Sequence, residues 1–497
     1  MNIISRGRIL LLGMAISVSG SLFAKIVPGT PFADHAVLQR GVKVPVWGSA
    51  TPGNTVKVAF AGQQVAGKVA ENGKWRLYLE PMTASAEGRT MTMVEIDQNG
   101  AELPGKIKVS DILVGEVWLA SGQSNMDCPV WGDNPRFRDS EGALVVAGTF
   151  LPNIRYVSVP RVWSVEPKAY QAKWKRFIPS DILSGPPLSA IAFYFSRELH
   201  LALSVPVGIV SVAWGGTNID AWTPRSVYEK DCPEALKEVA AYQVRKDWKG
   251  NRDQTPVINS PQDQPTVLWN GMVDTWAPMA VKGMLWYQGC SNKAEPGLYC
   301  EKMHALYKGW STHFGNPGLK LYFVQLAPYA SNWMEMVAAQ NKFAAEEKNA
   351  AIAVAADLGN FYDIHPNKKR TVAQRLLIHA LKNDYGFDIK RSDSPVFKEV
   401  SFEGGKATLK FDNVSSWYVY ADNRSVQPPF EMAGTNGVWQ AARLTNVEGS
   451  GKVKGNELKL ESKLVPDPVK VRYMGRNRTM GTLYNELSLP LGPFESK

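Results

Sequence analysis

The stretch LVGEVWLASGQSNM, residues 113–126, decides the fold of the central part of the chain. Its first eight residues, apolar except for Glu116, form a run of the kind that a strand buried on both faces shows. Four more such runs follow, separated by long amphipathic stretches, which is the pattern of repeated β-α-β units. The sequence therefore predicts a parallel sheet with strands at Leu113–Ala120, Val205–Ala213, Val281–Tyr287, Lys320–Leu326 and Ala351–Ala356.

Helices are expected between or after these strands, because apolar residues recur there with a helical period. In the last of them Val372, Leu376 and Ala380 recur every fourth residue and fall on one face. The fold class predicted from the pattern is α/β over residues 109–392. The expected helices are Leu188–Leu203, Leu298–Phe314, Trp333–Asn349 and Lys368–Asp384.

The regions on either side of this part show short alternating runs broken by turn residues, which is typical of antiparallel strands. We expect a small β-sandwich over residues 25–108 and a β-rich region over residues 393–497. The expected strands are Val42–Trp47, Val56–Phe60, Trp75–Leu79 and Thr90–Glu95 in the first region, and Ala407–Phe411, Trp417–Tyr420, Glu457–Leu460 and Val469–Tyr473 in the second.

The first 24 residues have the features of a secretory signal peptide. Arg6 and Arg8 precede an apolar run from Ile9 to Ile16, and small residues lead to Ala24. No later stretch approaches the roughly 18 apolar residues that a spanning helix requires. The sequence therefore predicts cleavage near Ala24, no membrane span, and a periplasmic or secreted protein.

Composition and charge exclude several classes of protein. The chain has 497 residues, of which 44% are hydrophobic and 21% charged, an ordinary globular balance. The net charge of +10 comes from dispersed Lys and Arg, without a basic run or a nucleic-acid-binding motif, so no nucleic-acid partner is expected. The sequence leaves the oligomeric state open.

Polar residues follow the predicted strands at the point where each strand ends. Ligands of open α/β sheets bind at this edge. The loops that begin at Ser121, Trp214 and Gln288 hold Ser124, Gly216 and Asn292, and the loop after the last strand leads to Asp363 and His365. Together they offer what acyl transfer needs: a serine, an imidazole to take its proton, an acid to orient the imidazole, and donors for the oxyanion.

The Ser124 context differs from the nucleophile elbow of α/β-hydrolases, because Met126 stands where G-x-S-x-G has its second glycine. It resembles the SGNH hydrolase superfamily instead, whose four blocks contribute Ser, Gly, Asn and His in the order Ser124, Gly216, Asn292 and His365. At closer range the chain resembles the sialate O-acetylesterase family. The matching stretches are residues 114–126, Trp214–Thr217, Trp286–Gly289, Asp363–Pro366, Val37–Arg40, Val44–Gly48 and Leu483–Asn485.

The resemblance implies an SGNH, flavodoxin-like three-layer α/β/α core and a serine esterase that hydrolyses O-acetyl groups from sialic acids through an acetyl-serine intermediate. It implies Ser124 as nucleophile, His365 as base, and Gly216 with Asn292 as oxyanion donors. No cofactor is expected. Residues expected to contact the acetylated sugar are Gln123, Trp214 and Trp286.

Two positions depart from the family. Cys290 stands where the family usually has Glu, and Tyr362 stands three residues before His365, where many SGNH enzymes have the acid. Asp363 is therefore the first candidate for the acid, Asp357 the second, and a Ser-His dyad the third.

Several alternatives stay open at this stage. The same chemistry on another acetylated glycan such as xylan is the first, and an inactive carbohydrate-binding protein is the second. Arg161, Arg225 and Arg375 are candidates to bind a sialate carboxylate.

The cysteines and the remaining histidines point to no metal site. Four cysteines allow three pairings, and we expect Cys290 to be paired with Cys300 or simply buried rather than a thiol nucleophile. The histidines other than His365 show no metal-ligand spacing, so no metal site is expected. The four cysteines are Cys128, Cys232, Cys290 and Cys300, and these histidines are His35, His200, His304, His313 and His379.

Overall fold

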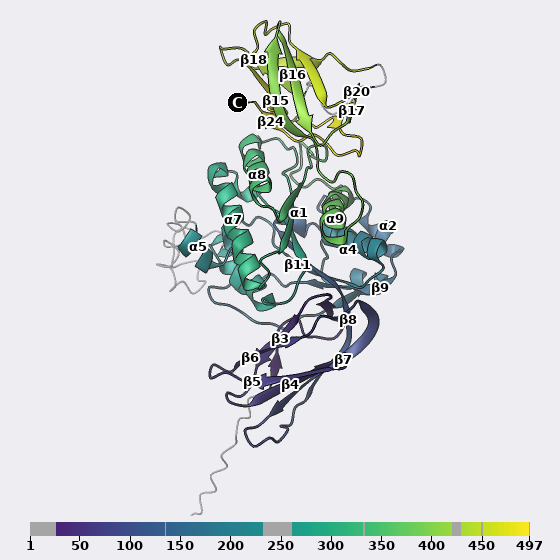
Figure 1. Cartoon of the computed structure of the whole chain (residues 1–497), viewed down its shortest axis with the longest axis vertical. Coiled ribbons are helices and arrows are strands. Elements are labelled where there is room, and N and C mark those ends of the chain that lie inside the picture. Colours follow the sequence, from purple (N-terminus) through teal and green to yellow (C-terminus); the bar gives the residue numbers. More distant parts are fainter. Residues whose placement is uncertain are drawn as a thin grey trace, which may run out of the picture.

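The computed structural model describes residues 26–134, 136–231, 261–331, 333–419, 429–448 and 451–496. The expected signal peptide and Cys232 lie outside these residues. Over the described ranges, no helix combines the length and the apolar character that crossing a membrane would take. Figure 1 shows an elongated molecule with a β region at each end and an α/β part between them.

The N-terminal β region consists of two sheets whose apolar faces meet. Alternation produces this arrangement: in Lys74–Leu79, residues Trp75, Leu77 and Leu79 are buried while their neighbours face solvent. One sheet has the order β1-β3-β6, and β4, β5 and β7 form an antiparallel set in the other. Their bounds are β1 Val27–Pro28, β2 Val37–Gln39, β3 Val44–Ser49, β4 Thr55–Phe60, β5 Gln63–Lys68, β6 Lys74–Leu79 and β7 Ser85–Ile96.

The long strand β8, Ile107–Gly122, joins this region to the central part. Its first half pairs with β7 and β2, and its second half pairs with β11 and β12 on its two sides. The boundary that we expected at residue 108 therefore falls inside a continuous strand, and one sheet runs through both regions.

The central sheet has the order β10-β9-β11-β8-β12-β13-β14, in which only β10 is antiparallel to its neighbour. From β11 to β14 this order is that of a doubly wound fold, with the first strand in chain order placed between the second and the third. The strands are β9 Leu151–Ser158, β10 Lys175–Phe177, β11 Val207–Ala213, β12 Gly283–Tyr287, β13 Lys320–Val324 and β14 Ala350–Ala353.

Helices cover this sheet on two sides: α7 and α8 pack together on one side, and α4 and α9 pack together on the other (Figure 1). The helices are α1 Ser124–Asp127, α2 Gly142–Ala147, α3 Pro179–Leu183, α4 Ala190–Leu203, α5 Arg225–Asp231, α7 Pro296–His313, α8 Met334–Glu346 and α9 Lys369–Tyr385.

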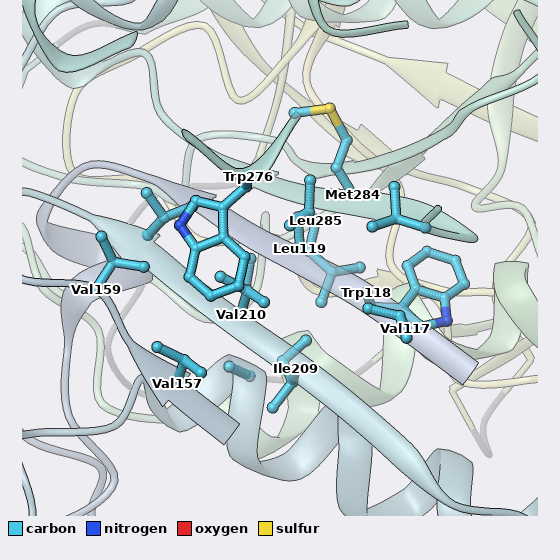
Figure 2. Close-up of a cluster of buried hydrophobic side chains, with 14 of the residues drawn as sticks. Val117, Trp118, Leu119, Val157, Val159, Ile209, Val210, Trp276, Met284 and Leu285 are labelled. Carbon is cyan, nitrogen blue, oxygen red and sulfur yellow. The ribbon is translucent and has the colours of Figure 1, made fainter. Parts of the chain in front are cut away.

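The centre of the molecule is filled by side chains of these strands. Figure 2 shows Val117 and Leu119 of β8, Val210 of β11 and Leu285 of β12 in one cluster, with Trp276 beside them. All five are at most 1% exposed. The central strands are therefore buried on both faces, which explains why their sequences are apolar runs without alternation.

The C-terminal β region has a core of its own, to which Val354 and Ala356, just after β14, contribute. It contains a sheet of order β15-β16-β21-β19-β18-β22-β24 and a smaller one of order β20-β17-β23. The strands are β15 Val396–Glu403, β16 Lys406–Asp412, β17 Ser416–Val419, β18 Phe430–Ala433, β19 Gln440–Leu444, β20 Lys452–Lys454, β21 Glu457–Glu461, β22 Lys470–Tyr473, β23 Leu483–Tyr484 and β24 Phe494–Glu495.

The mixed α/β centre and the β-rich C-terminal region agree with expectation. Each of the five expected central strands and four expected helices is present, with ends that differ by a few residues. The expectation missed β9 and β10 at the edge of the sheet. The last residue of the expected strand Trp417–Tyr420 lies outside the described residues.

Candidate active site

Ser124 is the first residue of α1 and lies directly beyond the end of β8. The strand ends at Gly122, whose φ of +140° and close packing both require glycine, because an added Cβ would lie 2.3 Å from the carbonyl oxygen of Tyr287. The close approach of β8 and β12 thus places the serine at the carboxyl edge of the sheet, beside the loop that follows β12.

His365 and Asp363 complete a hydrogen-bonded series with this serine. His365 Nε2 lies 2.9 Å from Ser124 Oγ, and His365 Nδ1 lies 3.2 Å from Asp363 Oδ1. The Asp363 carboxylate also accepts the backbone N–H of His365 at 2.9 Å, so one side chain holds both the loop and the ring. Phe137 packs edge-on against the imidazole with ring centroids 4.9 Å apart. The geometry is that of a nucleophile, a base and an orienting acid.

The environment of His365 favours the neutral imidazole that a general base requires. Partial burial lowers the pKa of His365, Asp363 raises it, and the positive charge of Lys369 lowers it again, with a net fall below the usual value. His365 is therefore unprotonated, and able to accept the serine proton, at neutral pH.

Lys369, at the start of α9, is a supporting residue that sequence reasoning missed. Its side chain is completely buried, and its Nζ donates to Asn125 Oδ1 at 2.5 Å. Asn125 in turn donates to the backbone carbonyl of Ile364 at 3.0 Å. The residue after Ser124 is thus tied to the residue before His365. Burial lowers the pKa of Lys369 to about 8.

The glycine pair of the loop after β11 passes over the nucleophile. A Cβ on Gly215 would lie 3.2 Å from the Cβ of Ser124, whereas a Cβ on Gly216 would meet no described atom within 4 Å. Gly216 has a φ of +79° and is exposed, so its backbone faces open space beside the serine. Asp127 accepts the N–H of Gly215 at 3.3 Å and fixes the loop.

The loop after β12 is held by Gln123, whose side chain is 3% exposed. Gln123 Oε1 accepts the N–H of Gly289 at 3.0 Å and of Ser291 at 3.3 Å, and Gln123 Nε2 donates to Ser291 Oγ at 3.3 Å. We expected Gln123 to contact substrate, but the structure commits its polar atoms to this loop.

Asn292 lies at the end of this loop and is 1% exposed. Its Oδ1 accepts the N–H of Ile219 at 3.0 Å and the amide of Gln288 at 2.7 Å, while its Nδ2 donates to Glu295 Oε1 at 2.7 Å. An amide nitrogen carries two hydrogens, so one N–H remains beyond the bond to Glu295.

Lys302 of α7 supports Asn292 from behind and was also missed by sequence reasoning. It is 1% exposed, and its Nζ lies 2.8 Å from Glu295 Oε2 and 2.9 Å from Asp220 Oδ2. Neither lysine carries a local sequence signal, because a Lys inside a helix is usually a solvated residue.

Comparison with known proteins identifies the family. A family model described as "Carbohydrate esterase, sialic acid-specific acetylesterase" matches residues 257–382. The solved structure of a carbohydrate acetylesterase from Xanthomonas citri is 30% identical, covers 95% of this chain and 99% of that chain, and superposes with a TM-score of 0.79. Sialate O-acetylesterases from Mus musculus and Homo sapiens are 28% and 27% identical; they cover 76% and 73% of this chain, and 77% and 72% of their own lengths are matched.

The chain belongs to the sialate O-acetylesterase family. It is a carboxylic ester hydrolase.

Some of the residues in the stretches shared with this family support the fold rather than the chemistry. Arg40 Nε and Gln39 Nε2 lie 2.5 and 3.0 Å from the carboxylate of Glu116, which is 2% exposed in β8. Tyr385 at the end of α9 donates to the same carboxylate at 3.0 Å. The family stretches around residues 39 and 116 therefore fix the N-terminal β region on the central part.

Cys290, where the family usually has Glu, is not paired with Cys300. Cys128, Cys290 and Cys300 are all free thiols, which corrects the expected pairing. Burial raises the pKa of Cys290 to about 12, so the thiol is protonated at neutral pH and is not a nucleophile.

The two tryptophans that we expected to contact the sugar, Trp214 and Trp286, differ in how deeply they are buried. Trp286 is 1% exposed and packs edge-on against Trp222 with ring centroids 6.5 Å apart, because β12 is a central strand with both faces covered. The expectation that Trp286 contacts a sugar is therefore wrong for this structure. Trp214 is partly exposed on the loop that carries Gly216 and remains a candidate.

Among the three arginine candidates, Arg161 contacts Asp127, the last residue of the short helix α1 that begins at Ser124. Its Nη2 lies 2.6 Å from Asp127 Oδ2, and its side chain is 52% exposed. Arg375 is buried and pairs through both Nη atoms with Asp357 at 2.7 Å. This pairing also occupies Asp357, the second candidate for the acid. Arg225 pairs with Glu229 on the surface of α5.

Proposed function

We propose that this chain is an SGNH-type serine esterase that removes O-acetyl groups from sialic acids through an acetyl-serine intermediate. The single observation that carries the proposal is the series Ser124 Oγ, His365 and Asp363, joined by contacts of 2.9 and 3.2 Å. The doubly wound strand order and the helices on both sides of the sheet support the SGNH, flavodoxin-like three-layer core.

The reaction begins when Ser124 Oγ attacks the acetyl carbonyl carbon and transfers its proton to His365 Nε2. The tetrahedral intermediate then breaks its bond to the sugar oxygen, which leaves with the proton from His365. Asp363 stabilises the imidazolium that exists between these steps. Water, deprotonated by His365, attacks the acetyl-serine in the same way, and acetate leaves as Ser124 regains its proton.

The oxyanion is stabilised by donors that surround Ser124. We assign the backbone N–H groups of Ser124 and Gly216 and the second N–H of Asn292 to this role. The exposed backbone of Gly216 and the fixed amide of Asn292 support the assignment, since preorganised donors need no rearrangement during the reaction.

Arg161 is the residue that we assign to the carboxylate of a sialic acid. It is half exposed, and it is connected through Asp127 to the loop over the nucleophile. A guanidinium presents paired donors that match a carboxylate. Neutral sugars offer no such group, so Arg161 separates the two substrate classes.

An acetylated glycan such as xylan is the second candidate substrate, and one observation favours it. The Xanthomonas citri enzyme that covers 95% of this chain is described as a carbohydrate acetylesterase, without a restriction to sialic acids. The Ser124–His365–Asp363 geometry argues against the alternative hypothesis that the chain is an inactive carbohydrate-binding protein. Export to the periplasm or the medium, after cleavage near Ala24, remains a prediction.

The test measures acetate release by the mature chain from 9-O-acetylated sialic acid and from acetylated xylan. We expect release from the sialate, and a loss of about 10⁶-fold in kcat for Ser124→Ala. Arg161→Ala should raise KM for the sialate and leave any neutral acetyl ester unaffected, with Arg225→Ala as the matched control. Release of acetate from xylan alone would overturn the assignment of sialic acids as the substrate. Full activity of Ser124→Ala would overturn the proposed mechanism.

A further inference from the structure

Three side chains with metal-binding atoms lie together on α7 and α8, outside the Ser124 site. Cys300 Sγ lies 3.5 Å from Glu346 Oε2, and His304 Nε2 lies 3.0 Å from the same oxygen. One ligand atom from each residue lies within 4.8 Å of the others. In the part of the chain that the structure describes, this is the one group of three or more His, Cys, Asp and Glu side chains that meets this geometry.

The helices preorganise the three side chains. Cys300 and His304 are four residues apart on α7 and therefore lie on one face of the helix, as two metal ligands on a helix usually do. Glu346 is the last residue of α8, which packs alongside α7 (Figure 1). Phe343, one turn earlier on α8, packs against the His304 ring with centroids 4.8 Å apart and limits its rotation.

Two of the three separations are close to those that a tetrahedral zinc site requires. With Zn–S of about 2.3 Å and Zn–N and Zn–O of about 2.0–2.1 Å, tetrahedral angles place S and O about 3.6 Å apart and N and O about 3.4 Å apart. The cluster shows 3.5 Å and 3.0 Å. Insertion of a metal therefore requires His304 and Glu346 to separate by a few tenths of an ångström. It also requires Cys300 Sγ and His304 Nε2, which lie within 4.8 Å of each other, to stand about 3.6 Å apart.

The charges around the cluster are mixed. Lys342 Nζ lies 3.8 Å from Glu346 Oε1, the carboxylate oxygen that does not contact Cys300 and His304. Glu301 and Lys308 line the same surface hollow. The hollow leaves one side of the cluster open to solvent, where water is available as a fourth ligand.

We propose that Cys300, His304 and Glu346 bind one divalent transition-metal ion of the Zn²⁺ type, which links α7 to α8. Thiolate and imidazole ligands select such ions over Mg²⁺ and Ca²⁺, which prefer oxygen ligands. On binding, the Cys300 thiol releases its proton to solvent, and its S–H contact with Glu346 is replaced by two metal–ligand bonds. The site is structural, because none of its ligands belongs to the Ser124–His365–Asp363 series.

This inference revises the expectation that the chain holds no metal site. The spacing Cys300-x-x-x-His304 is present in the sequence. The spacings among the histidines alone do not contain it, because its other member is a cysteine. The third ligand lies 42 residues beyond His304, and only the packing of α7 on α8 brings it into reach.

The experiment uses the mature chain, stripped with a chelator and titrated separately with Zn²⁺, Co²⁺ and Mg²⁺ in a calorimeter. We expect one Zn²⁺ per chain, a thiolate-to-metal charge-transfer band with Co²⁺, no binding of Mg²⁺, and a Tm that rises with Zn²⁺ by at least about 2 °C. Cys300→Ser and His304→Ala should each weaken Zn²⁺ binding by at least about 100-fold.

Glu346→Gln should weaken binding as well, whereas Glu347→Gln makes the same chemical change at the next residue and should bind like the wild type. Circular dichroism and acetate release show whether each variant is folded. Absence of Zn²⁺ binding to the folded wild type would overturn the proposal, as would binding that survives both Cys300→Ser and His304→Ala. Because binding and Tm are read without substrate, failure here is distinct from failure of the esterase proposal.

Discussion

Two buried lysines support the two sides of the candidate site, and they differ in the charge of their partners. Lys302, behind Asn292, donates to the carboxylates of Asp220 and Glu295. Lys369, behind Ser124 and His365, donates to the neutral amide of Asn125. Burial acts on the pKa of both in the same direction, but the two carboxylates outweigh it at Lys302 and raise its pKa above the usual value. At Lys369 burial prevails and lowers the pKa to about 8.

The charge of Lys302 therefore does not change with pH in the working range, whereas the charge of Lys369 does. Lys302 keeps its charge over the whole working range, so the Asn292 side of the site has a fixed geometry. Lys369 loses its charge near pH 8, and this charge acts on His365. The comparison predicts that mutations on the Lys302 side change stability, whereas mutations on the Lys369 side change the pH dependence of catalysis.

The largest effect is expected on the Lys369 side, for Asp363→Asn. Loss of the orienting carboxylate should lower kcat by about 10⁴-fold, as in other serine hydrolases, with little change in stability because the side chain is partly exposed. Asp363 raises the pKa of His365, so its removal should move the acid limb of the kcat/KM profile to lower pH. Rates of acetate release between pH 4 and 9 check this. An acid limb at higher pH would contradict the assigned role.

The next largest effect is expected on the Lys302 side, for Lys302→Met. The substitution leaves the carboxylates of Asp220 and Glu295 without their cation, and breaking a buried ion pair in this way costs about 3–5 kcal/mol. Urea unfolding measures the loss. As a control, Asp220→Asn and Glu295→Gln are added to Lys302→Met, and this triple variant should regain part of the stability. A single variant as stable as the wild type would contradict the comparison.

The smallest effect on rate is expected for Lys369→Met, which removes a positive charge near His365. That charge lowers the pKa of His365, so the acid limb of kcat/KM should move to higher pH, opposite to Asp363→Asn. An unchanged acid limb would show that Lys369 acts on His365 only through Asn125.

The same variant has a signature in stability. Between pH 8 and 10.5 the unfolded wild type keeps a proton that the folded wild type has released, so stability rises with pH across this window. A fall in pKa from 10.5 to about 8 corresponds to on the order of 3 kcal/mol. Urea unfolding at pH 8 and pH 10 should show the rise in the wild type and not in Lys369→Met.

The central sheet was predictable because most of its strands are buried on both faces and are therefore mainly apolar. Strand β9 escaped because Pro152, Asn153 and Arg155 interrupt its apolar run. Arg155 is nevertheless buried, and its Nη1 lies 2.6 Å from Asp111 Oδ2 in β8. A charged residue that finds its partner 44 positions away leaves no local pattern in the sequence.

In the candidate site too, residues with a local sequence pattern were predictable, and residues whose partners are distant in sequence were not. Ser124 and His365 were found because each lies in a loop after a predicted strand. Lys369 was missed because its partner Asn125 lies 244 residues away, although Asn125 is inside the matching stretch 114–126 and Lys369 follows the stretch Asp363–Pro366 by three residues. The burial of Trp286 was not anticipated, because nearness to a motif loop in sequence does not show which face of a central strand is open.

The shared strand β8 bears on how this architecture can be taken apart and recombined. The C-terminal region has sheets of its own, and Val354 and Ala356 of the central part complete its core, so a splice between Tyr385 and Val396 leaves every strand whole but divides that core. A splice at residue 108 instead cuts a strand whose hydrogen bonds serve both regions. The two ends of the molecule therefore look alike in outline, but only the N-terminal one shares a strand with the centre.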